Sequence, residues 1–458
     1  MPFLFGAPLC RPSVKATPLN DLLDRFSRGT IRVGIIGLGY VGIPLALSAL
    51  RGGLTVIGFD IDEARVAGLN AGMSAIKHIP TGDIVEAVAT GRFEATADFN
   101  RLDEPDALLI AVPTPLSKQR EPDLSYVVAT TKAIARRLRP GQLVVLESTT
   151  YPGTTRDIMK PILEAAGLKS GRDFFLAYSP EREDPGNTEH STRTIPKVVG
   201  GDGTMASALA NALYRRVVDV TVPVSSPETA EAVKLTENIF RAVNIALVNE
   251  LKVIYAAMGV DIWEVIEAAK TKPFGFMPFY PGPGLGGHCV PIDPFYLTWK
   301  AREYDIATRF IELAGEINTR MPYLVVSKLV ENLDRRLGKP LTQAKILLLG
   351  IAYKKNVEDI RESPSLKLIG IIEERGGAVD FYDPYVAVIP PTREHGELKG
   401  RKSVKLTAAS IASYDAIIIA TDHDDVDYKL IATHAKLVID TRNVMERRKI
   451  SNKRVIKA

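Results

Sequence analysis

A glycine pattern, G-x-G-x-x-G, stands between an apolar run and a helical stretch near the start of the chain. The apolar run covers residues 31–36, and the helical stretch covers residues 43–51. Glycines at this spacing allow a tight turn and let the backbone approach a phosphate group at the helix N-terminus. The pattern therefore predicts a β-α unit that binds the pyrophosphate of a dinucleotide. The residues of the pattern are Gly37, Leu38, Gly39, Tyr40, Val41 and Gly42.

An acidic residue stands directly after the next predicted strand. The strand covers residues 54–59, and Asp60 follows it. A carboxylate at this point of a dinucleotide-binding fold accepts hydrogen bonds from the ribose hydroxyls. It also repels a ribose 2′-phosphate, so we expect NAD rather than NADP as the cofactor. The alternative interpretation is a glycine-rich turn that holds no ligand.

Apolar runs continue to alternate with helical stretches, at residues 107–112, 143–146 and 174–178. Such an alternation is typical of a doubly wound α/β domain with a mainly parallel sheet. Ligands of these sheets bind at the carboxyl ends of the strands, so Thr114 and Thr149 are placed to face the cofactor. Hydroxyl groups in such loops are equally suited to capping a helix.

Breaks in this pattern divide the chain into four segments. Residues 1–30 are interpreted as an N-terminal extension that ends in a short helix, because they lack the continuous apolar core of a signal peptide. We predict a Rossmann-like domain over residues 31–222, a helical central domain over 223–338 and a second Rossmann-like domain over 339–458. The last domain has a strand at 345–349, but its loop lacks the second and third glycines of the dinucleotide pattern. It therefore either binds a nucleotide in another way or serves only as packing.

The central segment begins with a long helical run, residues 227–259. This length is unusual for a globular protein, so the helix is expected to bridge two domains. Lys234, Asn238 and Arg241 recur at i, i+4 and i+7 and share one face. Such a stripe is usually solvated, but here the neighbouring positions are Ala, Leu, Ile and Val. A partly buried lysine and asparagine one turn apart are suited to stabilising a developing oxyanion.

A second glycine-rich stretch, residues 281–294, presents one thiol. It has four glycines within six residues, prolines on both sides, Cys289 and then Asp293. The chain has two cysteines, and one held in a rigid loop is a candidate nucleophile. The neighbouring His288 either lowers the pKa of this thiol or is an ordinary hydrogen-bonded loop histidine. The alternative is a buried, inert cysteine in a packed turn.

The overall composition excludes several classes of function. The formal net charge of the 458-residue chain is +4, which is too small to argue for nucleic acid but suits an anionic small substrate. No apolar run reaches the length needed to cross a bilayer. Two distant cysteines, Cys10 and Cys289, do not form a disulfide framework and favour a reducing cytoplasm. We predict no metal site.

The chain from about residue 31 resembles the UDP-glucose/GDP-mannose dehydrogenase family, whose members oxidise the C6 hydroxyl of a nucleotide sugar to a carboxylate with two NAD. Three blocks carry the resemblance. They are the glycine pattern with Asp60, the long helix with the Cys289 loop, and the stretch 353–364. The resemblance implies two Rossmann-like domains joined by a long helix, with the UDP-sugar bound by the C-terminal one. It also implies a homodimer or a larger homo-oligomer.

Within this family, the sequence of residues 179–182, 281–297 and 440–443 is most similar to that of enzymes that act on UDP-N-acetylhexosamines. UDP-N-acetylglucosamine is the substrate that this similarity implies, and surface polysaccharide precursor synthesis is the implied pathway. UDP-N-acetylmannosamine and UDP-glucose remain alternatives. The chain departs from UDP-glucose dehydrogenases after Pro180-Glu181, where those enzymes carry an aromatic residue and a leucine. The identity of the hydrolytic base, Glu181 or Glu183, therefore stays open.

The resemblance also implies the role of individual residues. Lys234 and Asn238, with a water near Thr149 and Asp293, would serve the alcohol oxidation, and Cys289 would carry the thiohemiacetal and thioester. Water would then hydrolyse the thioester with Glu181 or Glu183 as the base. Cofactor contacts implied beyond the glycine pattern are Asp60, Arg65, Thr114, Thr149 and Arg361. Substrate contacts implied are Arg182, Glu183, Lys234, Asn238, Arg241, Gly286, Tyr353, Lys354 and Arg442.

Two other classes of function share parts of this pattern. A two-electron hydroxyacid dehydrogenase has a Rossmann domain and a long helix with a lysine and an asparagine, but it has no use for Cys289. A non-catalytic NAD or UDP-sugar binding protein would bind its ligands without turnover. For each binding residue named above, a structural or surface ion pair is the competing interpretation.

Overall fold

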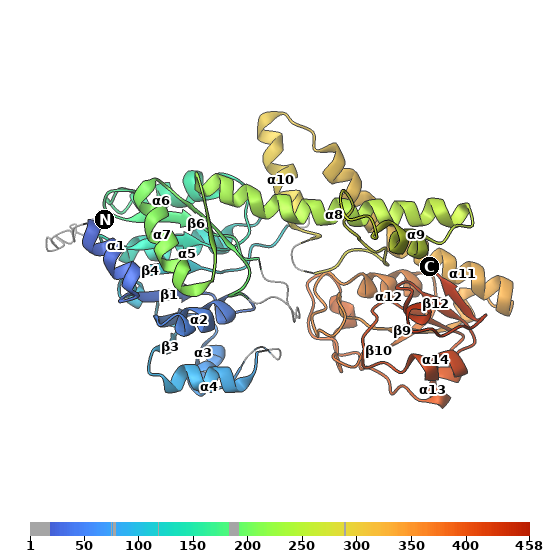
Figure 1. The fold of residues 1–458 in the computed structure, drawn as a ribbon. Coiled ribbons are helices and arrows are strands. Elements are labelled where there is room, and N and C mark those ends of the chain that lie inside the picture. Colours follow the sequence, from blue (N-terminus) through green and yellow to red (C-terminus); the bar gives the residue numbers. More distant parts are fainter. Residues whose placement is uncertain (1–18, 75, 77–78, 118, 183–191, 288–289) are drawn as a thin grey trace, which may run out of the picture. The chain divides into compact units, whose positions relative to one another are not determined.

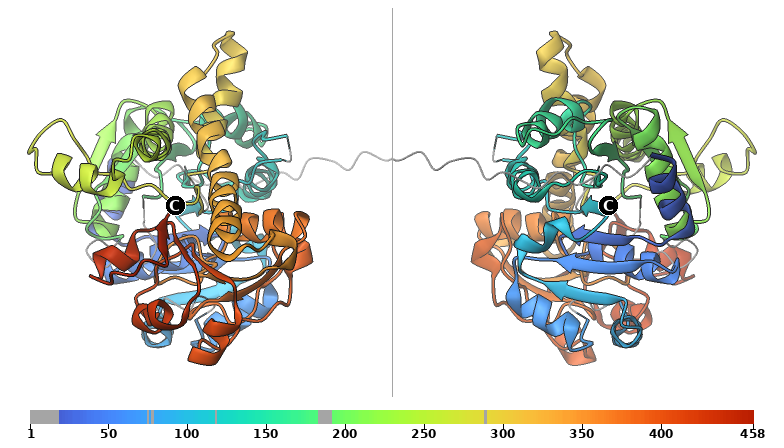
Figure 2. Two further views of the ribbon diagram at one scale, coloured as in Figure 1. Left: turned by 90° about the vertical axis from the view of Figure 1, so that its right-hand side faces the viewer. Right: turned by 90° about the vertical axis from the view of Figure 1, so that its left-hand side faces the viewer.

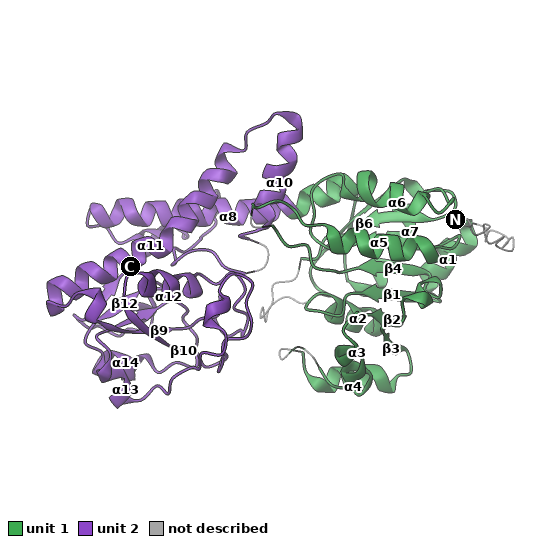
Figure 3. Ribbon diagram, turned by 180° about the vertical axis from the view of Figure 1, so that it is seen from behind, with its two compact units in different colours: residues 1–234 green, residues 235–458 purple. Residues whose placement is uncertain are grey.

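The computed structural model describes residues 19–458 except 75, 77–78, 118, 183–191 and 288–289 (Figure 1). It divides into two compact units, residues 1–234 and 235–458 (Figure 3). The division falls inside one helix, α8 (Pro227–Ala257), which has 31 residues. This helix is the long run predicted from the sequence, and Gly259, with φ 74°, follows its end. Among the described residues, no helix combines the length and the apolar character needed to cross a bilayer.

Unit 1 contains a sheet with the strand order β3-β2-β1-β4-β5-β6-β7-β8. The order 3-2-1-4-5-6 is that of the dinucleotide-binding doubly wound fold, so the predicted fold class is confirmed. Neighbouring strands are parallel except β6 and β7, which are antiparallel. The strands are β1 (Arg32–Ile36), β2 (Thr55–Phe59), β3 (Phe93–Thr96), β4 (Ala107–Ile110), β5 (Leu143–Leu146), β6 (Phe175–Tyr178), β7 (Lys197–Gly201) and β8 (Thr221–Val224).

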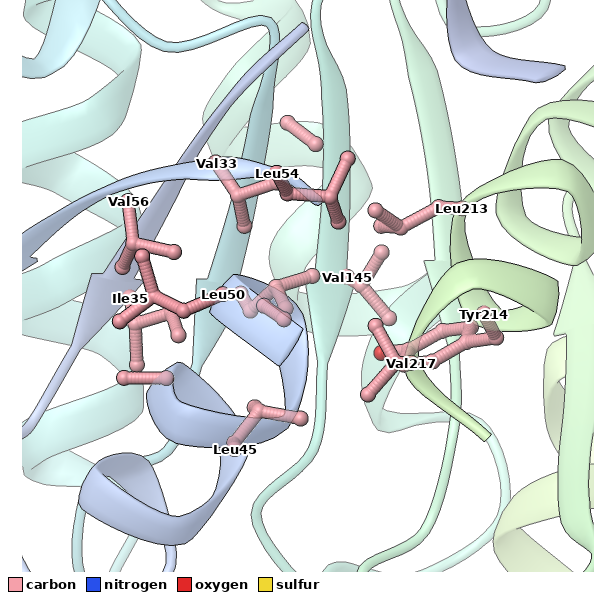
Figure 4. Close-up of a cluster of buried hydrophobic side chains, with 14 of the residues drawn as sticks. Val33, Ile35, Leu45, Leu50, Leu54, Val56, Val145, Leu213, Tyr214 and Val217 are labelled. Carbon is pink, nitrogen blue, oxygen red and sulfur yellow. The ribbon is translucent and has the colours of Figure 1, made fainter. Parts of the chain in front are cut away.

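The helices of unit 1 cover this sheet and supply much of its core. Figure 4 shows one buried cluster, in which Ile35 of β1 lies near Leu50 of the first crossover helix and Tyr214 lies beside Val217. The cluster forms because strands buried on both faces carry continuous β-branched and aliphatic runs. The helices are α1 (Leu19–Arg28), α2 (Gly42–Arg51), α3 (Glu63–Asn70), α4 (Thr81–Ala89), η1 (Phe99–Asp103), α5 (Ser125–Arg137), η2 (Thr154–Met159), α6 (Lys160–Glu164) and α7 (Thr204–Val217).

Unit 2 contains a second parallel sheet, with the order β10-β9-β11-β12-β13. The long helix α11 packs through Val325, Val326, Leu329 and Leu333 on this domain, and in the left-hand view of Figure 2 it is the gold-to-orange helix. The strands are β9 (Lys345–Leu349), β10 (Ala378–Tyr382), β11 (Ala416–Ile419), β12 (Val438–Asp440) and β13 (Val455–Lys457). The helices are α9 (Ile262–Ala269), α10 (Asp293–Ala301), η3 (Arg302–Tyr304), α11 (Arg309–Leu337), η4 (Leu341–Gln343), α12 (Pro364–Glu374), η5 (Gly396–Leu398), α13 (Ala408–Ser413), α14 (Tyr428–His434) and α15 (Val444–Arg447).

Candidate active site

The glycine pattern forms the turn from β1 into α2, and each glycine has a different reason to lack a side chain. Gly37 has φ 96°, and a Cβ there would lie 2.5 Å from the carbonyl oxygen of Ala111. A Cβ on Gly42 would lie 1.8 Å from the carbonyl oxygen of Gly37. At Gly39, by contrast, no atom lies within 4 Å of the Cβ position. The open space is therefore at the glycine where a pyrophosphate approaches the backbone.

Asp60 is buried after β2 and ties the glycine turn to the second strand. Its Oδ2 accepts hydrogen bonds from the backbone N–H of Leu38 at 2.8 Å and from Nη1 of Arg65 at 3.0 Å. Its Oδ1 accepts from the backbone N–H of Asp62 at 2.9 Å. The side chain of Arg65 is 35% exposed, so this pair lies at the edge of solvent. The turn and the acid together fit an adenosine ribose and a pyrophosphate.

The loops after β4 and β5 hold the two predicted threonines. Thr114 is buried, and Thr149 is half-buried. The loop after Thr149 is fixed by Glu231 of α8, whose carboxylate accepts hydrogen bonds from the backbone N–H of Gly153 at 2.6 Å and of Thr155 at 2.9 Å. Burial raises the pKa of Glu231 to about 7, although these hydrogen bonds act in the opposite direction. No local pattern predicts this role of Glu231, because its partners lie more than seventy residues away in the chain.

Glu181 follows β6 and is held at several points. Its carbonyl oxygen accepts a hydrogen bond from Nζ of Lys234 at 2.5 Å. Its Oε1 accepts from the backbone N–H of Arg182 at 2.7 Å, and its Oε2 lies 3.3 Å from Nζ of Lys197. Lys197 also donates to Glu147, a buried carboxylate after β5, at 2.6 Å. Lys197 and Glu147 were not predicted as site residues, because only the pairing of neighbouring strands brings them to Glu181.

Asn238 and Asp293 form a buried pair in unit 2. Nδ2 of Asn238, on α8, donates to Oδ2 of Asp293 at 2.5 Å, and Asp293 is the first residue of α10. Both residues that the sequence placed beside a reacting hydroxyl therefore come together. Lys234 is also buried, whereas Arg241, predicted on the same face of the helix, is exposed.

The glycines of the second glycine-rich stretch are needed for close packing in unit 2. A Cβ on Gly286 would lie 2.7 Å from Cβ of Tyr353 and 2.9 Å from Cδ of Pro364. Gly287, with φ 93°, lies against the ring of Tyr353, and its N–H donates to the carbonyl oxygen of Arg361 at 3.1 Å. The loop is thus shaped by the stretch 353–364. Cys289, His288 and Glu183 lie outside the described residues.

The first turn of this loop is held by α8. Oδ1 of Asn249 accepts from the backbone N–H of Gly282 at 3.0 Å, and its Nδ2 donates to Asn318 of α11 at 2.9 Å. The guanidinium of Arg442 lies against Gly282, and its Nε donates to the carbonyl oxygen of Ala420 at 2.8 Å. Burial lowers the pKa of Arg442. The sequence predicted Arg442 but not Asn249.

The other predicted residues of unit 2 lie around the loop after β9. Tyr353 and Lys354 are half-buried in this loop. Arg361 is exposed, and its guanidinium donates to the carboxylate of Asp359 from Nε at 2.9 and 3.0 Å and from Nη2 at 2.5 Å. In the described parts of the chain, no group of three or more His, Cys, Asp or Glu side chains is arranged to hold a metal ion.

Three domain models of one family match successive parts of the chain. The NAD binding domain of the UDP-glucose/GDP-mannose dehydrogenase family matches residues 31–218. Its central domain matches residues 228–320, and its UDP binding domain matches residues 347–447. The chain belongs to this family. It is accordingly an NAD-dependent nucleotide-sugar dehydrogenase with an NAD-binding domain and a UDP-binding domain, as the resemblance in sequence implied.

Individual members of the family are similar over nearly the whole chain. UDP-N-acetyl-D-glucosamine 6-dehydrogenase of Pseudomonas aeruginosa is 36% identical over 86% of this chain and 91% of its own length. UDP-N-acetyl-D-mannosamine dehydrogenase of Pyrococcus horikoshii is 36% identical over 91% of this chain and 96% of its own length. A solved structure of UDP-D-ManNAc dehydrogenase from the same organism has a TM-score of 0.81 at 35% identity, covering 90% of this chain and 95% of that one.

Proposed function

We propose that this protein oxidises the C6 hydroxyl of a UDP-N-acetylhexosamine to a carboxylate, with two NAD consumed per sugar. UDP-N-acetylglucosamine is the proposed substrate, and the product would serve as a precursor of surface polysaccharide. The observation that carries the proposal is the buried set Lys234, Asn238 and Asp293, in a chain with the family's NAD and UDP domains. Charged side chains are rarely buried, and these three residues stand at the positions to which the family resemblance assigns the alcohol oxidation.

The first oxidation requires a proton acceptor and a stabiliser for the alkoxide. We assign these roles to Lys234 and Asn238, with an ordered water near Thr149 and Asp293. The pair of Asn238 with Asp293 supports this assignment, because it fixes the amide in one orientation. NAD, when bound against the glycine pattern and Asp60, supplies the hydride acceptor.

The second oxidation requires a covalent intermediate. The thiolate of Cys289 would add to the aldehyde carbon to give a thiohemiacetal, and loss of a second hydride would give a thioester. Water would then add to the thioester carbonyl and lose a proton to a base, and the C–S bond would break. Glu181 is the base that we propose, because its side chain is 14% exposed and therefore within reach of water. The alternative base, Glu183, stays a prediction from the sequence.

The UDP-sugar is expected to contact the second glycine-rich stretch and the loop after β9. Gly286, Tyr353 and Lys354 are proposed contacts in unit 2, together with Arg442. The remaining proposed contacts are Arg182, Glu183 and Arg241 for the sugar nucleotide, and Arg65, Thr114 and Arg361 for NAD. These assignments rest on the family resemblance at each position.

The sugar configuration has a second candidate. UDP-N-acetyl-D-mannosamine dehydrogenases are as similar to this chain as the glucosamine enzyme is, at 36% identity for the Pyrococcus horikoshii protein. The two substrates differ in configuration at one carbon, which a few contacts can distinguish. The substrate class is therefore proposed as UDP-N-acetylhexosamine, with the manno sugar as the alternative.

The decisive measurement is the number of NADH formed per sugar consumed, with UDP-N-acetylglucosamine, UDP-N-acetylmannosamine and UDP-glucose in parallel. We expect two NADH with one acetamido sugar and little reaction with UDP-glucose. One NADH per sugar would remove Cys289 from its assigned role and favour a two-electron dehydrogenase. Ligand binding without turnover would favour a binding protein.

Substitution of the thiol tests the covalent step separately. In Cys289→Ala we expect no acid to form, while NAD affinity stays near that of the wild type, because the glycine pattern belongs to the other unit. The measurements are acid formation by chromatography and NAD binding by titration calorimetry. Unchanged acid formation would overturn the thioester mechanism.

We also infer that the chain forms a homodimer through α8. Phe240, Leu247, Val253 and Ile254 on this helix are more than 40% exposed. Exposed apolar side chains in such number on one helix are typical of an interface. Analytical ultracentrifugation of the wild type and of Leu247→Lys tests this inference, and a monomeric wild type would overturn it.

A further inference from the structure

Two buried charged side chains of unit 1, Glu147 and Lys197, lie next to Glu181. Glu147 follows β5 and is fully buried, and Lys197, the first residue of β7, is nearly so. Tyr214 of α7 donates to Oε1 of Glu147 at 2.5 Å, and Lys197 donates to Oε2 of the same carboxylate at 2.6 Å. Both oxygens of Glu147 are therefore engaged inside the core. This carboxylate serves as a fixed anchor for the ammonium group.

Lys197 extends from this anchor to Glu181. Its Nζ lies 3.3 Å from Oε2 of Glu181, whose side chain is 14% exposed, whereas the side chain of Lys197 is 5% exposed. The lysine thus connects a buried carboxylate to one that water can reach. Burial by itself lowers the pKa of Lys197, but the charges of Glu147 and Glu181 outweigh it and raise that pKa above its usual value. The ammonium therefore stays charged at neutral pH.

The strand arrangement explains why these groups meet. β6 pairs with β5 in parallel and with β7 antiparallel, so the carboxyl ends of β5 and β6 lie beside the amino end of β7. Glu147, Glu181 and Lys197 stand at these three points. The reversal of β7 is thus what delivers the lysine to the edge where ligands of such a sheet bind.

We propose that Lys197 is a positioning residue that orients the carboxylate of Glu181 and keeps it ionised for the hydrolysis of the thioester. The proposal rests on the function proposed above. In the hydrolytic step the water oxygen bonds to the thioester carbon and one water proton passes to Glu181. The C–S bond then breaks, and its electron pair leaves with the sulfur of Cys289. An ammonium beside the base maintains the charged form before the transfer and fixes its direction.

A lysine that served only to neutralise Glu147 would leave hydrolysis unaffected once Glu147 was also neutral. The variant E147Q/K197M removes both buried charges together, which avoids the unpaired buried carboxylate that K197M alone would leave. E147Q alone is the matched control, because it keeps the lysine beside Glu181. Far-UV circular dichroism and NAD titration verify that both variants fold.

The experiment is rapid mixing of each protein with excess NAD and UDP-N-acetylglucosamine, repeated with UDP-N-acetylmannosamine. For E147Q/K197M we expect a burst of two NADH per subunit, followed by acid formation 10- to 100-fold slower than in the wild type. Intact mass after acid quenching should show the sugar acyl group on the protein. For E147Q we expect no burst and no adduct. The acidic limb of the pH profile should move upward by about one unit only in the double variant.

Two results would overturn the proposal. One is that E147Q/K197M forms acid at the wild-type rate and shows no burst of NADH. The other is that the first two NADH form as slowly in this variant as the acid does, which is the result that a purely structural role of Lys197 predicts. Failure of the proposed function has a different signature, because the wild type itself would then yield one NADH per sugar or none.

Discussion

The two units close the first turn of their sheets with the same device. Asp60 follows the second strand of unit 1 and accepts a hydrogen bond from the backbone N–H of Leu38 in the glycine turn. Asp383 follows β10 of unit 2 and accepts from the backbone N–H of Ile351 at 2.7 Å and of Ala352 at 3.1 Å. In each case a carboxylate on one strand satisfies the N–H groups of the loop after its neighbour. The acid is therefore part of loop closure in both units.

The two acids differ in their second partner. Asp60 binds Arg65, whose side chain is partly exposed, whereas Asp383 binds Nε2 of His423 at 3.1 Å and both side chains are fully buried. Nδ1 of His423 accepts from the backbone N–H of Asn356, so Nε2 carries the proton and donates to the carboxylate. Asp383 of unit 2 is thus enclosed together with its partner, whereas the partner of Asp60 in unit 1 is in contact with solvent. The difference agrees with an NAD-binding domain in one half of the chain and a UDP-binding domain in the other.

The comparison teaches that a conspicuous acid after the second strand does not by itself indicate ribose binding. Its first task is to hold the loop, and ligand contact depends on whether the side chain that shares this oxygen is exposed, as Arg65 is in part, or buried, as His423 is. Substitutions of these two acids, of Arg65 and of Glu231 test how burial and partners set the role of a carboxylate.

Removal of the sealed acid should have the largest effect on stability. Asp383→Ala removes the acceptor of the His423 N–H and of four backbone N–H groups, those of Ile351, Ala352, Tyr385 and Val386. We expect a loss of about 3–5 kcal/mol in the free energy of unfolding, with NAD affinity unchanged. Urea unfolding and NAD titration provide the measurements. A loss below about 1 kcal/mol would show that the acid is not essential for loop closure.

The same acid also predicts a pH dependence. Burial by itself raises the pKa of Asp383, but the hydrogen bond from His423 and those from the backbone N–H groups leave that pKa below its usual value of 3.8. Its stabilising contribution is therefore complete above pH 3.8 and is lost as the pH falls through the lower folded value. Asp383→Ala should lack this part of the acid transition. An unchanged acid transition would contradict the assignment.

Unit 1 should show the opposite sign through Glu231. The pKa of this carboxyl group rises from 4.5 to about 7 on folding, so its contribution is present below pH 4.5 and is lost as the pH rises to about 7. We expect a loss of about 2–3 kcal/mol over this interval. Glu231→Gln keeps an acceptor for one of the two N–H groups, does not titrate, and should therefore remove the slope. Urea unfolding between pH 4 and pH 8 measures the free energy of unfolding as a function of pH. An equal pH dependence in the wild type and in Glu231→Gln would contradict the expectation.

Neutralising Asp60, the buried acid beside a partly exposed arginine, should affect the ligand more than the fold. In Asp60→Asn we expect NAD affinity to fall about tenfold, or about 1.4 kcal/mol, because the charged acceptor for the ribose is lost. The amide oxygen still accepts from Leu38, so the stability loss should stay below that of Asp383→Ala. Calorimetric titration with NAD and with UDP gives the contrast. Equal loss for both ligands would mean that the acid acts only through the fold.

The arginine beside this acid should contribute least. The Arg65–Asp60 pair is partly exposed, and such pairs contribute about 0–1 kcal/mol. For Arg65→Gln we expect the free energy of unfolding to fall by no more than about 1 kcal/mol. We expect the NAD affinity to change several-fold at most. Urea unfolding measures the stability of the variant, and calorimetric titration with NAD measures its affinity. A loss as large as that of Asp60→Asn would assign ribose recognition to the arginine instead.

Much of the fold could be predicted because its elements carry local signals. Residues 143–146 and 345–349 were predicted as strands with the observed bounds of β5 and β9, since both are short apolar runs. β3 and β7 were not predicted. β3 alternates between buried and partly exposed positions over four residues, and β7 begins with a lysine and ends in two glycines. Such short segments become strands through pairing with neighbours that sequence patterns do not reveal.

The residues of the candidate site also divide into those that the sequence predicts and those that it does not. The glycine pattern, Asp60 and the Lys234–Asn238 stripe are visible in the sequence, because turns and helices fix their spacing over a few residues. Lys197 and Glu147 were missed because fifty residues separate them, and only the antiparallel entry of β7 makes them neighbours. Asn249 and Glu231 were missed for the same reason.

The family, the cofactor and most of the helices and strands could be predicted from the sequence alone, since these depend on short patterns of glycine, charge and apolar periodicity. The tertiary structure decided which polar groups are sealed and which stay open. Asp60 and Asp383 both follow a strand and hold a loop, yet one is covered by a histidine from a distant strand end and the other is not. Burial and long-range partners set the charge and reach of a side chain, and neither is encoded at the position of the residue itself.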